Sequence, residues 1–329
     1  TTLGGDNGIA VALMMALLDD DTLVHPPLEC VFTVQEEVGL IGAVSLDGSL
    51  LSAETMINLD SEEEGIATVS CAGGLRMQFD RQAKWQSSTG KRGLLIKISG
   101  LPGGHSGIDI DKERTNANKL MGRVLASLPE SCDIAYIKGG NKDNAIPREC
   151  IAVVAVPDIA AAKEAAQKMQ VQILAECAEL DQGFCIQMEE VEAPPTMGDC
   201  ACSKQVISLM YLAPNGVLSM SPSMQGLVES SSNMGVVRTE GEDIWVSFSP
   251  RSSVESRQDQ TEQRLKILAE AFGFEFHLRN RYPGWAYDPN SRIRELAKST
   301  YEQMFQRPFR LEAIHAGLEC GILKAKAPQ

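Results

Sequence analysis

The spacing of apolar residues changes at about Cys71, and this change limits the folds that the chain can adopt. Before Cys71, apolar residues recur at helical spacing over residues 7–20. Two short runs rich in strand formers follow, at residues 28–34 and 55–59. A helix combined with buried strands is typical of an α/β layer. We therefore expect residues 1–71 to form part of an α/β domain.

After Cys71, strand-like runs alternate with long amphipathic stretches. The strand-like runs lie at residues 94–98, 150–156, 184–188, 244–248 and 274–278, and the amphipathic stretches at residues 116–128, 160–180 and 258–272. This pattern predicts an α+β domain inserted into the first one. A weak echo between residues 144–147 and 233–236 favours a duplicated insert.

The chain is predicted to return to the first domain after the turn at Pro283-Gly284. A helix over residues 291–305 and a strand over residues 309–314 follow this turn. We therefore divide the chain into a first part at residues 1–71, an insert at residues 72–282 and a second part at residues 283–329. Thr1 opens directly into a loop motif, and at Gln329 a parallel sheet would still need closing elements, so we expect the first domain to be incomplete at both ends.

The charge and cysteine content of the chain exclude several classes of function. The formal net charge is −14 at pH 7, whereas nucleic acids and anionic membranes are bound by basic surfaces. No apolar run reaches the roughly 18 residues that a spanning helix requires. The nine cysteines are odd in number and contain no CxxC pair, which is typical of reduced thiols in a cytosolic protein. A metal would therefore be bound mainly by oxygen and imidazole ligands.

Acidic residues follow the predicted helix start and both predicted strands. Asp6 precedes the helix, Glu36 and Glu37 follow the first strand, and Asp60 ends the second. In open α/β sheets, ligands collect at the carboxyl ends of strands. If Asp6, Glu37 and Asp60 converge there, their mutual repulsion requires a cation such as Zn²⁺ or Mn²⁺ between them. Taken singly, each acidic motif is better explained as a solvated turn or a charged loop.

Adjacent residues in an extended chain face opposite ways, so Glu36 and Glu37 are expected to have different roles. One can bind a metal while the other acts as a general base on a metal-bound water. His105 lies in the glycine-rich turn at residues 103–107, where its imidazole is accessible and could donate to an oxyanion. His315, in a turn just past a strand, is by itself better explained as a structural residue.

Together these motifs resemble the aminoacyl-histidine dipeptidases, cytosolic enzymes of the M20 metallopeptidase family that hydrolyse Xaa-His dipeptides such as carnosine. The resemblance runs from Thr1 to about Lys324, and its motifs occur in the family's order. They are TTLGGDNGIA, FTVQEEVGLIGA, INLDSEEEG, CAGG, GLPGGHSG, NANKL, NAIPRE, NGV, GVV, PGW and HAGLECG. The resemblance implies an M20-type zinc-peptidase catalytic domain that is α/β and split, with a large inserted α+β lid domain.

The resemblance also implies roles for the acidic residues. Asp6 corresponds to a carboxylate that bridges two zinc ions, for which manganese or cobalt could substitute. Glu37 and Asp60 correspond to terminal ligands of the two metals, and Glu36 to the general base. The upstream His-x-Asp and the late histidine of the family have no counterpart between Thr1 and Gln329. Three of the family's five metal ligands are therefore present.

Further roles are implied for the lid and for the C-terminal turn. His105 corresponds to the lid histidine that approaches the scissile carbonyl, and Asn144 to a lid residue near the substrate's carboxylate end. Arg251 lies where the duplicated lid could offer a guanidinium to a carboxylate. Glu319 either contacts the substrate or caps the segment that follows it.

Three readings of the function remain open from the sequence. The first is hydrolysis of Xaa-His dipeptides, such as β-Ala-His, by a small cytoplasmic enzyme that is compatible with a homodimer. The second keeps the fold and the metals but takes another small peptide or an N-acyl amino acid as substrate, as an aminoacylase does. The third is a catalytically incomplete fragment that lacks two metal ligands.

Overall fold

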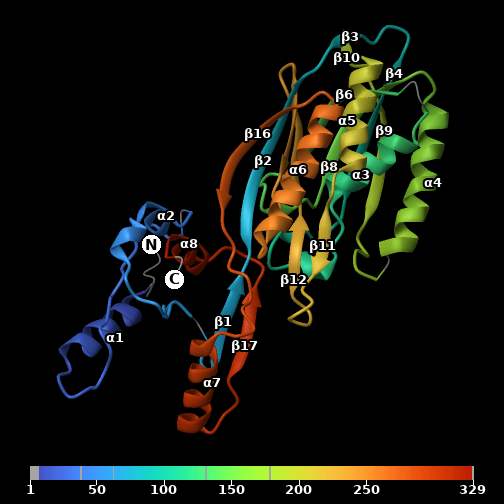
Figure 1. The fold of residues 1–329 in the computed structure, drawn as a ribbon. Helices are drawn as coiled ribbons and strands as arrows, with labels where there is room; N and C mark the ends of the chain where they lie inside the picture. The colour runs from blue at the N-terminus through green and yellow to red at the C-terminus, as the bar shows by residue number, and fades with distance from the viewer. Residues whose placement is uncertain (1–6, 38, 62, 130–131, 178, 328–329) are drawn as a thin grey trace.

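The computed structural model describes residues 7–37, 39–61, 63–129, 132–177 and 179–327 (Figure 1). The helices are α1 (Gly8–Asp19), α2 (Ile41–Ser45), α3 (Ala117–Ser127), α4 (Ile159–Cys177), α5 (Cys200–Leu212), α6 (Glu255–Ala271), α7 (Arg292–Phe305) and α8 (Glu319–Lys326), with short 3-10 helices η1 (Gly48–Leu50) and η2 (Ile110–Lys112). No helix in these ranges combines the length and apolar character needed to cross a membrane.

The first nine strands are β1 (Ile66–Cys71), β2 (Gly73–Gln82), β3 (Trp85–Ser87), β4 (Arg92–Ser99), β5 (Gly104–His105), β6 (Asp133–Gly139), β7 (Ala145–Ile146), β8 (Cys150–Val156) and β9 (Cys185–Val191). The others are β10 (Thr196–Gly198), β11 (Gly216–Met220), β12 (Val228–Ser232), β13 (Met234–Glu240), β14 (Asp243–Phe248), β15 (Arg251–Ser252), β16 (Glu275–Tyr282) and β17 (Arg310–Ile314). The fold is therefore mixed α/β, as predicted.

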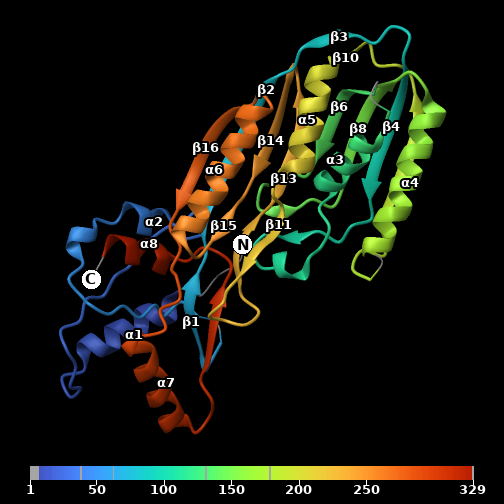
Figure 2. The ribbon, with the colours of Figure 1, turned by 45° about the vertical axis from the view of Figure 1, so that its right-hand side comes forward.

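One large sheet dominates the molecule. Its strand order is β11-β12-β15-β2-β14-β13-β6-β8-β4-β9, and β16 pairs with β2 outside this path. Helices α3, α4, α5 and α6 lie against this sheet (Figures 1 and 2). Alternate residues of β4, namely Leu94, Ile96 and Ile98, point into the core and are fully buried, because side chains along a strand alternate between its two faces. The sheet and its helices form the main hydrophobic core.

A smaller group of elements lies at one end of the large sheet (Figures 1 and 2). Here β1 and β17 pair in parallel, as expected for two strands of an α/β domain. Helix α2 packs on α8 through the buried residues Ala43, Ile322 and Leu323. The side chain of Asn7 caps α1 by accepting a hydrogen bond from the Ala10 amide, which satisfies one free donor of the first turn.

The predicted strands at residues 28–34 and 55–59 are wrong, because both runs are irregular. A strand requires a partner for its backbone N–H and C=O groups, and neither run pairs with another described strand. Several of their apolar side chains are exposed, including Phe32, Val34 and Ile57. Strand propensity alone was therefore insufficient to form a sheet here.

The chain enters and leaves the large sheet at one place. Cys71 and Trp285 exchange both backbone hydrogen bonds, at 3.0 and 2.9 Å. Gly73 and Gly284 touch backbone to backbone, so that a Cβ on Gly73 would lie 2.5 Å from the Gly284 nitrogen. Only glycine permits so close an approach. The exact division of the chain into residues 1–71, 72–282 and 283–329 stays a prediction.

Candidate active site

The turn at residues 315–320 contacts the segments that carry the predicted acidic residues. The Thr33 hydroxyl donates a hydrogen bond to Glu319 Oε2 at 2.9 Å. The Asn58 side-chain amide donates to Cys320 Sγ at 3.5 Å. Segments that lie 286 and 262 residues from the turn in sequence are therefore held against it in space.

The N-terminus of α1 joins this group through a further hydrogen bond. The side-chain amide of Asn7 donates to the carbonyl of Leu59 at 3.1 Å, which places the residue before Asp60 against the start of α1.

Burial raises the pKa of the Cys320 thiol, and the negative charges of Glu319 and Asp60 act in the same direction, while the Asn58 hydrogen bond opposes them. Asp60 and Glu319 therefore lie within electrostatic range of the same thiol.

A strained turn carries Glu36 and Glu37. Gln35 and Leu40, on either side of it, have φ angles of 58° and 60°, in the left-handed region that residues other than glycine rarely occupy. The Glu36 carbonyl accepts hydrogen bonds from the amides of Gly39 and Leu40, which closes the turn. Such strain persists only where the surrounding structure enforces it, and it is common at functional sites.

The predicted acidic residues differ in their exposure. Glu36 is half-buried, whereas Glu37 and Asp60 are exposed; Asp6 lies outside the described residues. Within the part of the chain that the structure describes, no three His, Cys, Asp or Glu side chains lie close enough together to hold a metal ion.

The donor chemistry of the residues present nevertheless fits a divalent cation. Glu37 and Asp60 offer carboxylate oxygens, and Glu319 Oε1 is a buried oxygen without a hydrogen-bond partner among the described residues. Oxygen donors of this kind suit Zn²⁺ and Mn²⁺.

His105 is held as a neutral imidazole on the opposite side of the 315–320 turn. Its Nδ1 accepts hydrogen bonds from the amides of Gly107 and Ile108 at 3.2 and 3.1 Å, so the proton resides on Nε2. Burial lowers the pKa of His105, and the positive charge of Arg251 lowers it further, while Asp109 partly opposes them. The side chain therefore presents a neutral Nε2–H donor.

Asn144 lies beside His105, where backbone pairing and side-chain hydrogen bonds hold its segment. Strands β5 and β7 pair His105 with Ala145, and the Ser106 amide donates to the Asn144 carbonyl at 2.9 Å. The buried Asn233 side chain donates to the carbonyls on both sides of Asn144, at 2.9 and 2.8 Å. The position of Asn144 relative to His105 is therefore set by the backbone.

Arg251 is a buried cation for which the described part of the chain provides no ion-pair partner. Its side chain forms no ion pair with any Asp or Glu of the described chain, and its Nε has no hydrogen-bond partner there. Among the described residues, its side chain donates one hydrogen bond, from Nη1 to the Tyr282 hydroxyl at 3.2 Å. A buried charge is costly unless an opposite charge accompanies it. Arg251 is therefore suited to binding an anion.

His315 connects the two sides of the site. Its Nε2 lies 2.7 Å from the buried Ser231 hydroxyl, and burial, followed by the charge of Arg251, lowers its pKa to about 3. Its carbonyl oxygen packs so closely on Gly107 that a Cβ there would lie 2.5 Å from it. The one turn thus contacts the His105 loop through His315 and the acidic segments through Glu319.

Sequence reasoning missed Ser231 and Tyr282. Ser231 lies within an unremarkable serine-rich strand, and Tyr282 ends a strand next to the Pro-Gly turn. Neither residue carries a motif signal, because its importance arises from its cross-strand neighbours.

The fold and a family match define the class of this protein as a peptidase that contains a dimerisation domain. Residues 96–181 match the peptidase dimerisation domain of the M20 family. The chain is 36% identical over 337 residues to the cytosol non-specific dipeptidase of Escherichia coli (strain K12), a match that covers 100% of this chain and 69% of that protein. The chain therefore belongs to the M20 peptidase family, and within it to the dipeptidases.

A solved structure supports the same assignment. The crystal structure of aminoacylhistidine dipeptidase from Vibrio alginolyticus matches this chain with a TM-score of 0.95 and 34% identity, over 100% of this chain and 68% of that one. The predicted M20 fold is therefore confirmed. The chain spans about two thirds of the length of each of these relatives.

Proposed function

We propose that this dipeptidase hydrolyses dipeptides with C-terminal histidine, such as β-Ala-His, at a two-zinc site. The observation that carries the proposal is the buried Arg251, which has no acidic partner among the described residues and lies within electrostatic range of the neutral His105. A dipeptide has one free carboxylate close to its single peptide bond. A guanidinium that binds this carboxylate would therefore place the scissile carbonyl near His105.

The acidic residues would hold the metals. Two zinc ions bound by Asp6, Glu37 and Asp60, or manganese or cobalt in their place, would supply an activated water and polarise the substrate carbonyl. The support for these assignments is the convergence of the acid-bearing segments on the 315–320 turn and the donor chemistry of the described carboxylates.

Proton transfer would be carried by Glu36. Its carboxylate would accept a proton from the attacking water and return it to the nitrogen of the leaving histidine. The Nε2–H of His105 would donate a hydrogen bond to the oxygen on which negative charge develops. Because His105 is already neutral and oriented by two backbone amides, little reorganisation accompanies this step.

Asn144 and Glu319 would complete the substrate site. Asn144 is held beside His105 and would bind the carboxylate end together with Arg251. Glu319 has one carboxylate oxygen bonded to Thr33 and one without a partner among the described residues, and the free oxygen could accept a hydrogen bond from the substrate. Glu319 also lies in the first turn of α8, where its negative charge interacts favourably with the helix dipole.

The name of the Escherichia coli relative supports a second candidate substrate range, whereas that of the Vibrio alginolyticus relative agrees with the first. The Escherichia coli relative is called non-specific and the Vibrio alginolyticus one aminoacylhistidine dipeptidase. Hydrolysis of other dipeptides, or of N-acyl amino acids that share the free carboxylate, is therefore the alternative. We further propose a homodimer, from the dimerisation domain match, and a cytosolic location, from the name of the first relative.

The test compares β-Ala-His with its C-terminal amide, which lacks the carboxylate. In the zinc-loaded enzyme, Arg251→Met should lower kcat/KM for the acid by about 30-fold to 1,000-fold and leave the amide nearly unchanged. Arg238→Met, on a surface arginine that stacks on Trp245, is the matched control. Equal losses on the acid and the amide would exclude Arg251 as the carboxylate site. Profiling Xaa-His against other dipeptides and acyl amino acids separates the two substrate ranges.

A further inference from the structure

The side chain of Tyr282 reaches Arg251 across a strand that offers no side chain between them. Strand β2 runs between β15 and β16, and its Gly74 is paired with Arg251 on one side and with Tyr282 on the other. The Tyr282 hydroxyl accepts a hydrogen bond from Arg251 Nη1 at 3.2 Å. Three residues from distant parts of the chain thus form one row across the sheet.

Gly74 leaves the space that this row requires. A Cβ on Gly74 would collide with the hydroxyl and ring of Tyr282, and these are its nearest neighbours. Gly74 does not have a positive φ, so its backbone conformation is open to any residue. Glycine is therefore needed at position 74 because it leaves space for the Tyr282 side chain, and not because of its backbone freedom.

The 315–320 turn closes the other side of the Tyr282 ring. A Cβ on Gly317 would lie 2.7 Å from Cε2 of the tyrosine. The ring therefore fits between Gly74 and Gly317, and the turn that carries His315 and Glu319 packs directly on it. The orientation of Tyr282 is coupled to both sides of the candidate site.

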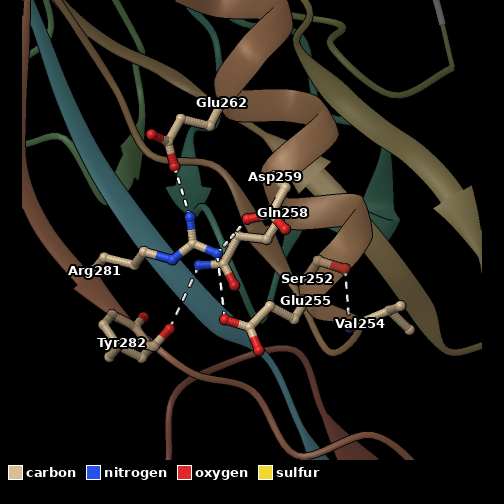
Figure 3. Close-up of polar contacts among 8 residues, drawn as sticks. All are labelled: Ser252, Val254, Glu255, Gln258, Asp259, Glu262, Arg281 and Tyr282. Carbon is tan, nitrogen blue, oxygen red and sulfur yellow. Dashed lines mark hydrogen bonds and ion pairs between the residues drawn. The ribbon is translucent and has the colours of Figure 1, made fainter.

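Contacts to α6 hold the end of β16 in place. Figure 3 shows Arg281 directed toward three carboxylates of α6: it bonds Glu262 at 2.7 Å and Glu255 at 3.3 Å and also pairs with Asp259. The buried Gln258 donates to the Tyr282 carbonyl at 3.4 Å. These contacts fix the backbone from which the tyrosine projects.

From this geometry we infer that Tyr282 is a positioning residue: its hydroxyl, admitted by Gly74, holds the Arg251 guanidinium in the orientation that binds the substrate carboxylate. The inference rests on the proposed role of Arg251. A neutral hydroxyl orients the guanidinium without neutralising it, so the positive charge stays available to the substrate. A carboxylate in the same place would form an ion pair and compete with the substrate.

The experiment measures kcat and KM of the zinc-loaded enzyme on β-Ala-His and on its C-terminal amide. Tyr282→Phe keeps the ring in its slot and removes only the hydroxyl. It should raise KM for the acid about tenfold, as expected for one hydrogen bond to a charged group, with kcat and the amide kinetics within about twofold of the wild type. In an Arg251→Met background the same substitution should have no further effect.

Two more variants separate positioning from general structural damage. Gly74→Ala, whose new methyl meets only the Tyr282 side chain among its nearest atoms, should reproduce the effect of Tyr282→Phe. Tyr301→Phe removes a hydroxyl bonded to Glu64 at 3.4 Å on the exposed side of α7 and should change no kinetic constant. Thermal unfolding of each variant checks that the fold is retained.

The outcomes distinguish this inference from the proposed function. If Arg251→Met leaves the preference for acid over amide unaltered, the carboxylate role of Arg251 and the positioning role of Tyr282 are both overturned. If Arg251→Met abolishes this preference, the carboxylate role of Arg251 stands and Tyr282→Phe tests the positioning role alone. That role is overturned if Tyr282→Phe affects the acid and the amide equally, or if its effect adds to that of Arg251→Met. An acid-specific, non-additive effect supports it.

Discussion

The burial of His315 should make the protein less stable in mild acid. In the folded state its pKa is lowered to about 3, first by burial and then by the positive charge of Arg251. In the unfolded chain a histidine titrates near pH 6.5. Between these two values the unfolded state binds a proton that the folded state does not. The stability that depends on a neutral His315 is therefore fully present above about pH 6.5, and it is lost progressively as the pH falls toward 3.

The size of this loss follows from the two pKa values. Between pH 7 and pH 5, the unfolded state gains a proton at this position while the folded imidazole stays neutral, which amounts to about 2 kcal/mol in the free energy of unfolding. The 7% exposure of the residue and the nearby positive charge of Arg251 indicate that the folded site resists protonation.

Urea unfolding at pH 7 and pH 5, followed by tryptophan fluorescence, measures the effect. Trp285 is a suitable reporter because its backbone pairs with Cys71 where the chain enters the large sheet. His315→Gln should lower stability at pH 7 through its altered contacts, but it should also remove about 2 kcal/mol of the pH dependence. An unchanged difference between the two pH values in the variant would refute the assignment of this pH dependence to His315.

Three further expectations concern single side chains. Glu36→Gln should lower kcat by about 10² to 10⁴-fold with the zinc content retained, and turnover within a few fold of the wild type would remove Glu36 as the base. His105→Ala should lower kcat by roughly 10² to 10³-fold without loss of zinc, because the residue donates a hydrogen bond and binds no metal; metal loss in the assay would contradict this. Arg281→Ala should destabilise the protein by about 1 kcal/mol in urea unfolding. Arg279→Ala, which removes two hydrogen bonds to the neutral Gln78 side chain, should have a smaller effect, and equal effects would argue against the carboxylate network.

Elements with strong local periodicity were predictable. The helices α3, α4, α6 and α7 lie where their apolar spacing placed them, and strands β8 and β14 match the predicted runs. These patterns depend on residues within a few positions of each other, which any stretch of the chain contains in full. The same reasoning failed at residues 28–34 and 55–59, because a strand also needs a partner that local sequence does not specify.

Sequence motifs were sufficient to predict the family, since TTLGGDNGIA, GLPGGHSG and HAGLECG together indicate an M20 dipeptidase. They also drew attention to Glu36, Glu37 and Asp60, whose roles remain predictions. These assignments were accessible because the motif residues are contiguous in the chain. His315 shows the limit: the motif contains it, but nothing local revealed its burial beside Arg251.

The row of Arg251, Gly74 and Tyr282 required the folded structure. Its members come from three strands, and which residues face one another depends on the register of β15 and β16 on β2. Register is set by hydrogen bonds between segments up to about two hundred residues apart and by the packing of the whole sheet, so a shift of one residue would turn these side chains to opposite faces. Local patterns in the sequence carry no information about that register, and the unpaired charge of Arg251 becomes visible only when the strands are assembled.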